Sequence, residues 1–303
     1  MGSPLGFGRE GGRVAQIEMP SFTGPNAQQI QYWNEAAGET WAAREDTLDQ
    51  MIAPIGERVL ALAAAAPGEK VVDVGCGCGA TTLELARQVG LKGAVLGVDV
   101  SRPMLGRALV RAKARGPHTN FLLADAQTAD LGREDFDLVF SRFGVMFFAD
   151  PTAAFANLRR ALRAGGRLAF VCWQPFQCNP WMLVPTIAIA RHAPMSSPDP
   201  NLPGPFAFAD PERVRSILSR ANFSEVAIDG VELSLAPGGG DPDRAAEFAL
   251  EIGPGAAALR AAGAGPELRA LAADSVREAF GPFIQEGVLR MPASIWLVHA
   301  RRV

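Results

Sequence analysis

Three glycines at alternate positions follow a short apolar run in VVDVGCGCG, residues 71–79. The apolar residues predict a buried strand near 70–74, and ATTLELARQ predicts a helix over Ala80–Gln88. Glycines between a strand and a helix let a nucleotide-like ligand approach bare backbone, because they turn tightly and have no Cβ. A second strand, predicted at 94–99, ends on Asp99, where an acid can accept hydrogen bonds from both ribose hydroxyls. Together these signals predict a nucleoside-binding site.

The glycine spacing and one acid separate two classes of ligand. A pyrophosphate-binding loop has the spacing G-x-G-x-x-G, whereas this loop has G-x-G-x-G and carries Asp73 two residues before Gly75. A carboxylate there repels a pyrophosphate but attracts an ammonium, directly or through water. S-adenosyl-L-methionine has a ribose, a sulfonium and an ammonium. It is therefore the expected cofactor, with S-adenosyl-L-homocysteine as its product.

Five segments resemble, in order, the class I S-adenosylmethionine-dependent methyltransferases that act on small molecules. They are VVDVGCGCG, GVDVSRPML, FLLADAQ, FDLVFSRFGVMFF and LRAGGRLAFVCW, and the resemblance extends from about residue 28 to the C-terminus. It implies an α/β fold: a doubly wound, seven-stranded, mostly parallel Rossmann-like sheet with an antiparallel last strand and a helical cap. It also implies an enzyme that transfers a methyl group by in-line displacement to an O, N or C atom of a small acceptor.

The resemblance further implies which residues hold the cofactor. The ammonium end is assigned to Asp73 and to the backbone carbonyl of Ser141, and the ribose to Asp99. In the family, an acid such as Asp125 binds the adenine amine. The remaining implied contacts come from Gly75, Cys76, Gly77, Val100, Met104 and Ala126. Solvent-facing strand ends are the alternative for the two acids Asp99 and Asp125, and ordinary helix packing is the alternative for Met104.

Aromatic residues before the core are candidates for the reaction centre. Tyr32, Trp33 and Trp41 stand in QYWNEAAGETW, and in similar enzymes an N-terminal aromatic helix closes over the methyl group. An aromatic face beside a sulfonium is favourable. We expect Trp33 to contact the cofactor and Tyr32 to be catalytic, with packing inside a lid as the alternative for the tryptophans. His192 is a second catalytic candidate, as a base, or else a surface histidine; because the methyl donor is already activated, a base is optional.

More aromatic residues follow the fourth and fifth predicted strands. Phe143 and Phe147 come after the fourth, Trp173 ends the fifth, and Trp181 lies beyond it. Some of these must belong to the core, but together they predict a pocket for an apolar or aromatic acceptor. Arg142 is assigned to the same pocket, although it could instead face the cofactor carboxylate or solvent.

Alternating strand and helix patterns define one domain over residues 26–303. N-terminal helices are expected at 26–66, a cofactor-binding core at 67–173, and cap segments at 174–209 and 241–283. An amphipathic helix over Ala154–Gly166, closed by a glycine pair, and a capped helix over Asp210–Phe223 are also predicted. The predicted strands are 70–74, 94–99, 120–124, 136–141, 167–173, 225–235 and 294–301. Residues 1–25 are expected to be a disordered or cloning-derived leader.

Bulk properties exclude several classes of function. The 303 residues carry a net charge of −3, which gives no general attraction for nucleic acid or an anionic membrane. The basic run from Arg102 to Arg115 is interpreted as a solvated helix face. No window reaches the ~18 apolar residues of a membrane span. The four cysteines suggest neither a disulfide framework nor a metal site, which favours a reducing cytoplasm. The oligomeric state is not indicated.

Three other functions share part of this pattern. A nicotinamide-dependent oxidoreductase has the same strand, loop and ribose acid, but Asp73, the glycine spacing and the Asp125–Ala126 pair disfavour it. A protein that binds S-adenosylmethionine without turnover remains open. Nucleic-acid methylation is disfavoured because SRFG stands after the fourth strand, where an NPPY-like motif would be needed.

Overall fold

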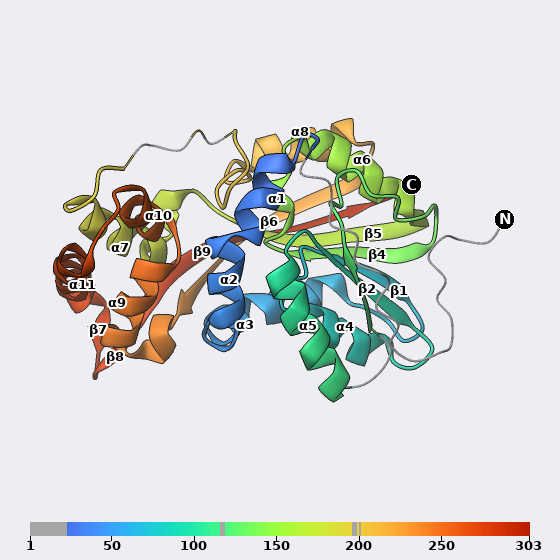
Figure 1. The fold of residues 1–303 in the computed structure, drawn as a ribbon. Helices are drawn as coiled ribbons and strands as arrows, with labels where there is room; N and C mark the ends of the chain where they lie inside the picture. Colours follow the sequence, from blue (N-terminus) through green and yellow to red (C-terminus); the bar gives the residue numbers. More distant parts are fainter. Residues whose placement is uncertain (1–22, 116–118, 196–198, 200) are drawn as a thin grey trace.

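The computed structural model describes residues 23–115, 119–195, 199 and 201–303, and its centre is a seven-stranded sheet (Figure 1). The strand order is β3-β2-β1-β4-β5-β9-β6, and β9 runs antiparallel to both of its neighbours. This confirms the predicted doubly wound, mostly parallel sheet. The strands are β1 (Lys70–Val74), β2 (Ala94–Asp99), β3 (Thr119–Leu123), β4 (Phe136–Arg142), β5 (Leu162–Trp173), β6 (Ser224–Leu235) and β9 (Met291–Arg301).

Helices cover both faces of this sheet. Helices α3, α4 and α5 pack together on one face, and α6 and α8 lie on the other, at the top of Figure 1. Two shorter helices, α1 and α2, precede α3 and lie near the carboxyl ends of the central strands. Their bounds are α1 (Ala27–Asn34), α2 (Ala36–Ala43), α3 (Glu45–Ala63), α4 (Ala80–Val89), α5 (Arg102–Arg115), α6 (Pro151–Ala161) and α8 (Pro211–Arg220).

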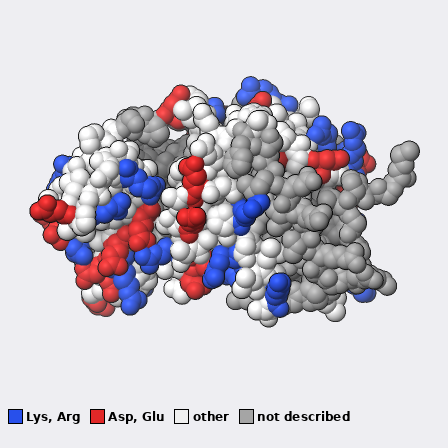
Figure 2. Space-filling view, viewed as in Figure 1, with Lys and Arg blue, Asp and Glu red and all other residues white. Residues whose placement is uncertain are grey.

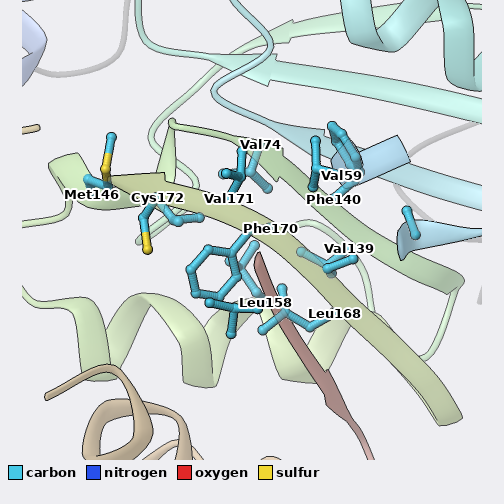
Figure 3. Packing of buried hydrophobic residues seen from close by; sticks show 14 of the residues in the cluster. Val59, Val74, Val139, Phe140, Met146, Leu158, Leu168, Phe170, Val171 and Cys172 are labelled. Atoms are coloured by element: carbon cyan, nitrogen blue, oxygen red, sulfur yellow. The ribbon is translucent and has the colours of Figure 1, made fainter. Parts of the chain in front are cut away.

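Most residues of the central strands are apolar, as expected where helices cover both faces of a sheet. Figure 3 shows Phe170 of β5 directed toward Leu158 of α6, while Val59 of α3 lies beside Phe140 of β4. All four side chains are fully buried. Burying a large apolar side chain contributes roughly 1.5–3 kcal/mol. The core therefore holds the strands in place. The loops at the strand ends, which carry the polar groups, are positioned by the same packing.

One predicted helix is wrong at its end. The pattern predicted a helix from Ala154 to Gly166, but α6 ends at Ala161 and β5 begins at once, because Leu162 pairs with Phe136 of β4. The glycine pair lies inside the strand instead of capping the helix. Gly165 has a φ of +72°, and its N–H donates to the Arg302 carbonyl at 2.8 Å.

Helices that follow β5 and β6 form a separate lobe, at the left of Figure 1. Within the two segments expected as caps lie α7 (Pro180–Ala190), α9 (Pro242–Glu251), α10 (Pro254–Ala261) and α11 (Pro266–Phe280). Their buried residues make a second apolar cluster that includes Ile189, Leu259, Val276 and Phe280. A two-stranded hairpin of β7 (Ile284–Gln285) and β8 (Val288–Leu289) follows and was not predicted. Residues 1–22 of the expected leader lie outside the described residues.

The surface carries charges of both signs. Figure 2 shows acidic and basic side chains side by side over the separate lobe. The basic run on α5 is not simply a solvated face, because Arg107 donates to Glu45 and Arg111 donates to Asp49, both on α3. Within the described residues, no helix combines the length and hydropathy that a membrane crossing needs.

Candidate active site

The loop after β1 lies against the loop after β4. Gly75 has a φ of +69°, and a Cβ added there would lie 2.5 Å from the Gly144 Cα. The N–H groups of Gly75 and Cys76 donate to the Val98 carbonyl at 2.8 and 3.2 Å, which ties the loop to β2. Only glycine fits this close approach.

Asp99 organises the same loop from the end of β2. Its two carboxylate oxygens accept hydrogen bonds from the N–H groups of Gly77 and Ser101, each at 2.8 Å. Burial raises the pKa of this carboxyl, and the backbone donors oppose that rise. The acid and the glycine loop, both predicted from the sequence, are thus brought together.

Asp73 is completely buried at the end of β1. One carboxylate oxygen accepts hydrogen bonds from the hydroxyls of Thr81 and Thr82, at 2.8 and 2.7 Å, whereas the other, Oδ1, is buried with no hydrogen-bond partner in the described structure. Burial raises the pKa of Asp73 to about 6, against the lowering effect of the threonines and of the Arg142 charge. A buried acceptor without a partner costs free energy, so this oxygen is suited to a ligand's ammonium or a water.

Asp125 is held at the edge of the site by a residue far away in the sequence. Its Oδ1 accepts from the Asn26 side-chain amide at 3.1 Å and from the Gln127 N–H at 2.9 Å. Asn26 also accepts from the Ala149 N–H at 2.8 Å. Asn26 therefore joins the N-terminal segment to two loops of the site.

Several of these residues surround a cavity of about 120 Å³ at the carboxyl ends of the strands. Of the predicted cofactor residues, those that line it are Trp33, Gly75, Asp99, Val100, Met104, Asp125 and Ala126. Asp73, Cys76, Gly77 and Ser141 are not among its lining residues. Ser141 is fully buried, where its hydroxyl donates to the Val74 carbonyl at 2.8 Å and accepts from the Gly144 N–H at 3.1 Å.

A second cavity, of about 290 Å³, lies between the sheet and the separate lobe. Tyr32, Phe143, Phe147, Trp173 and Trp181, all assigned to the site from the sequence, line it. None of its described lining residues carries a charged side chain. The lobe adds Phe248, Ile252 and Phe280, and α3 adds Leu48, Met51 and Ile52.

The two cavities meet at four aromatic residues that line both: Trp33, Trp41, Phe143 and Phe147. The Trp33 ring makes edge-to-face contacts with Trp41 at 5.6 Å and with Phe147 at 5.2 Å between ring centroids. Phe143 stacks on Trp173 at 4.2 Å and has a φ of +67°, a strained backbone for a residue with a side chain. The four residues form an aromatic collar, which is the name we keep for them.

The N-terminal helices are fixed to the loop that follows Asp99. The Ser101 hydroxyl donates to the Trp33 carbonyl at 2.7 Å, and the Asn34 side chain donates to the Val100 carbonyl at 2.7 Å. Gly38 lies inside α2, and a Cβ there would lie 2.0 Å from the Trp33 carbonyl oxygen, so glycine is required where α2 passes the end of α1. Trp33 is thus set over the site by contacts with the loop after β2.

The two catalytic candidates lie in different places. Tyr32 lines the larger cavity, with 43% of its surface exposed, and contacts the Trp33 ring edge-to-face. His192 follows α7, and its Nε2 is 2.8 Å from the Ser275 hydroxyl on α11. His192 is not among the residues that line either cavity, so we do not assign it a catalytic role.

The sequence did not indicate the role of Asn26. It also did not indicate that residues of α3 line the larger cavity together with the collar and the lobe. Asn26 had no motif around it. The α3 positions Leu48, Met51 and Ile52 have the spacing of one helix face, which would have predicted a packed face but not which cavity it lines.

Residues 71–166 match the sequence profile of a protein family described as a methyltransferase domain. An aklanonic acid methyltransferase from Streptomyces sp. (strain C5) is 34% identical over 122 residues, which cover 40% of this chain and 56% of that protein. A nocamycin O-methyltransferase from Saccharothrix syringae is 32% identical over 184 residues, covering 57% of this chain and 65% of that protein. The chain spans about half the length of the first of these relatives and about two thirds of the second.

A solved structure with the same fold is phosphoethanolamine N-methyltransferase 2 from Haemonchus contortus, in complex with phosphomonomethylethanolamine and S-adenosylhomocysteine. The TM-score is 0.54 at 15% identity, over 92% of this chain and 60% of that one. At this level of identity the likeness establishes the fold alone.

Proposed function

We propose that this protein transfers a methyl group from S-adenosylmethionine to a small, apolar or aromatic acceptor. The match of residues 71–166 to a methyltransferase domain supports the proposal. The observation that carries the proposal is the aromatic collar, whose residues line both the smaller cavity, where Asp99 and Asp125 lie, and the larger apolar cavity. A methyl donor in the first cavity and an acceptor in the second would meet there.

The residues of the smaller cavity fit the cofactor. Asp99, Asp125 and Ala126 all line this cavity. Asp99 would offer carboxylate oxygens to the ribose hydroxyls, and Asp125 and Ala126 would meet the adenine. Asp73 does not line this cavity, but its buried oxygen without a partner suits the ammonium. When bound, S-adenosylmethionine supplies an electrophilic methyl group on a sulfonium, a cation that aromatic faces such as that of Trp33 attract.

The chain's contribution to the reaction is alignment and exclusion of water. The collar and the apolar walls hold the acceptor atom in line with the methyl carbon and keep bulk water out. With S-adenosylmethionine bound, the acceptor's electron pair would form the new bond to the methyl carbon, and the pair of the broken sulfur–carbon bond would stay on sulfur. Tyr32 is the titratable side chain among the described lining residues of the larger cavity, and we assign it to the acceptor's proton or polar group.

The relatives support the acceptor class, since the two reported above are named for small organic molecules, aklanonic acid and nocamycin. The charges of both signs on the surface in Figure 2 make a nucleic-acid acceptor unattractive. The four free cysteines are consistent with work in a reducing compartment such as the cytoplasm.

The first test is calorimetric titration with S-adenosylmethionine, S-adenosylhomocysteine and NADH. Micromolar binding of both adenosyl-sulfur ligands and none of NADH is expected, and binding of NADH alone would reject the cofactor. A panel of phenols, enols and quinols, with methyl transfer followed by mass spectrometry, then separates an enzyme from a binder. If every acceptor fails while the cofactor binds, a non-catalytic protein becomes the better account.

A further inference from the structure

The polar side chains of the larger cavity are all hydrogen-bond donors. An indole N–H can only donate, and a hydroxyl can donate as well as accept. The described lining side chains that carry nitrogen or oxygen are the hydroxyls of Tyr32 and Thr186 and the indoles of Trp33, Trp41, Trp173 and Trp181. These side chains suit a ligand whose own polar group accepts hydrogen bonds.

The same cavity offers nothing to a charged group. Among its described lining residues there is no carboxylate, amide or basic side chain. Arg142, which the sequence assigned to the acceptor pocket, lines the smaller cavity instead, and its Nη2 donates to Asp49 Oδ1 at 3.1 Å. A charged ligand in the larger cavity would lose its water without meeting an opposite charge. The ligand's polar group is therefore uncharged.

Two of the donors lie on α7 and have no hydrogen-bond partner. Only 6% of the surface of Thr186 is exposed, and its hydroxyl makes no hydrogen bond within the described part of the chain. Thr40 of α2, by contrast, donates to the carbonyl of Ala36, as helical threonines commonly do, at 2.7 Å. The Nε1 atom of Trp181 is buried and also unpartnered. Such groups cost free energy until an acceptor atom meets them.

These two donors are separated from the place of methyl transfer. Trp173 stacks on Phe143 of the aromatic collar, with ring centroids 4.2 Å apart, and Trp181 contacts Trp173 at 5.0 Å. Trp181 is thus one ring contact further from the collar, and Thr186 follows it along α7, which belongs to the separate lobe (Figure 1). A molecule that reaches from the collar to α7 has its polar group away from the methylated atom.

We propose that the acceptor is an uncharged molecule with a carbonyl oxygen remote from its methylated atom, and that Trp181 and Thr186 donate hydrogen bonds to this oxygen. The proposal rests on the proposed function, because it takes the larger cavity as the acceptor site. A plain hydrocarbon would leave both donors unpartnered, and an ammonium would find no anionic side chain among the described lining residues. Trp181 and Thr186 thus determine which acceptor is bound and take no part in the transfer itself.

Three probes with one carbon framework test which polar group the cavity prefers. 1-Tetralone has a carbonyl, tetralin lacks it, and 1-aminotetralin carries an ammonium near neutral pH. Their affinities are measured by calorimetric titration of the full-length protein without cofactor. A cavity without free donors would favour tetralin, because a carbonyl loses its water on entry. We expect 1-tetralone to bind roughly 3- to 10-fold more tightly than tetralin, and 1-aminotetralin to bind most weakly.

Substitutions on α7 assign this preference to its donors. Thr186→Val keeps the shape of the side chain and removes the hydroxyl, and Trp181→Phe removes the indole N–H. Each should lower the ratio of the 1-tetralone and tetralin affinities roughly 3-fold. Two controls should leave that ratio as in the parent protein: Thr186→Ser keeps the hydroxyl, and Met182→Leu alters the same wall without altering a donor.

The outcomes separate this inference from the function on which it depends. Any ranking of the probes in which 1-tetralone is not first overturns the proposal, as does a parent protein that binds none of them. A ratio that neither Thr186→Val nor Trp181→Phe lowers, or that the two controls lower equally, also overturns it. Should a variant not fold, the ranking by the parent protein still decides. If 1-tetralone is preferred but S-adenosylmethionine does not bind, it is the proposed function that fails.

Discussion

Lowering the pH should weaken cofactor binding through Asp73. Its pKa, raised by burial to about 6, means that the side chain gains a proton within a range where the protein can be studied. A protonated carboxyl no longer attracts an ammonium. The ligand's own ammonium stays charged below about pH 7.7, so a change between pH 5 and 7 comes from the protein. Burial raises the pKa of Asp99 as well, and a variant at Asp73 therefore isolates the part due to Asp73.

The size of the effect follows from the pKa. With a value of about 6, about nine tenths of Asp73 is ionised at pH 7 and about one tenth at pH 5, so the affinity for S-adenosylhomocysteine should fall roughly 10-fold between them. The stability of the ligand-free protein changes in the opposite sense. Because the folded-state pKa is raised above the unfolded value of 3.8, the contribution of Asp73 to stability is present at low pH and declines by about 3 kcal/mol as pH rises from about 4 to about 6.

Calorimetric titration with S-adenosylhomocysteine at pH 5, 6 and 7 tests the binding prediction. Asp73→Asn keeps the shape and the hydrogen-bonding oxygen but cannot ionise, so its weaker binding should be flat over the same range. A flat profile in the parent protein, or the same slope in Asp73→Asn, would refute the assignment of the ammonium to Asp73.

Three further substitutions test other parts of the site. Asp99→Ala removes the ribose acceptor and leaves the Gly77 N–H without its acceptor, so calorimetry should show a roughly 10- to 100-fold loss of cofactor affinity; unchanged binding would reject the ribose assignment. Tyr32→Phe should lower kcat about 100-fold with the true acceptor and leave cofactor affinity unchanged, and an unaltered kcat would show that the hydroxyl has no role. Gly144→Ala would place a Cβ 2.5 Å from the Val74 carbonyl oxygen, and thermal unfolding should show a loss of about 1–3 kcal/mol; a parent-like melting temperature would mean that the two loops can separate.

Local patterns predicted the strands and the cofactor loop well, because each depends on neighbours in the sequence. The run around Val72 has the apolar pattern of a buried strand, and Gly75 has a positive φ, which glycine adopts readily. Asp99 could be assigned to the ribose because it ends the strand that follows the glycine loop and its helix, and both features are recognised from short stretches of sequence. The helix that was expected to reach Gly166 failed because pairing of Leu162 with Phe136, a contact across 26 residues, overrode the local preference.

Only the tertiary structure decided how the two cavities meet. Asn26 reaches Asp125 across 99 residues, and Arg142 meets Asp49 across 93. Periodicity along the chain reports which face of an element is apolar, not which distant element will cover it. The sequence by itself therefore determined the cofactor loop and its ribose acid, whose geometry is local. The aromatic collar, the free oxygen of Asp73 and the apolar cavity arose from packing between segments far apart in the chain.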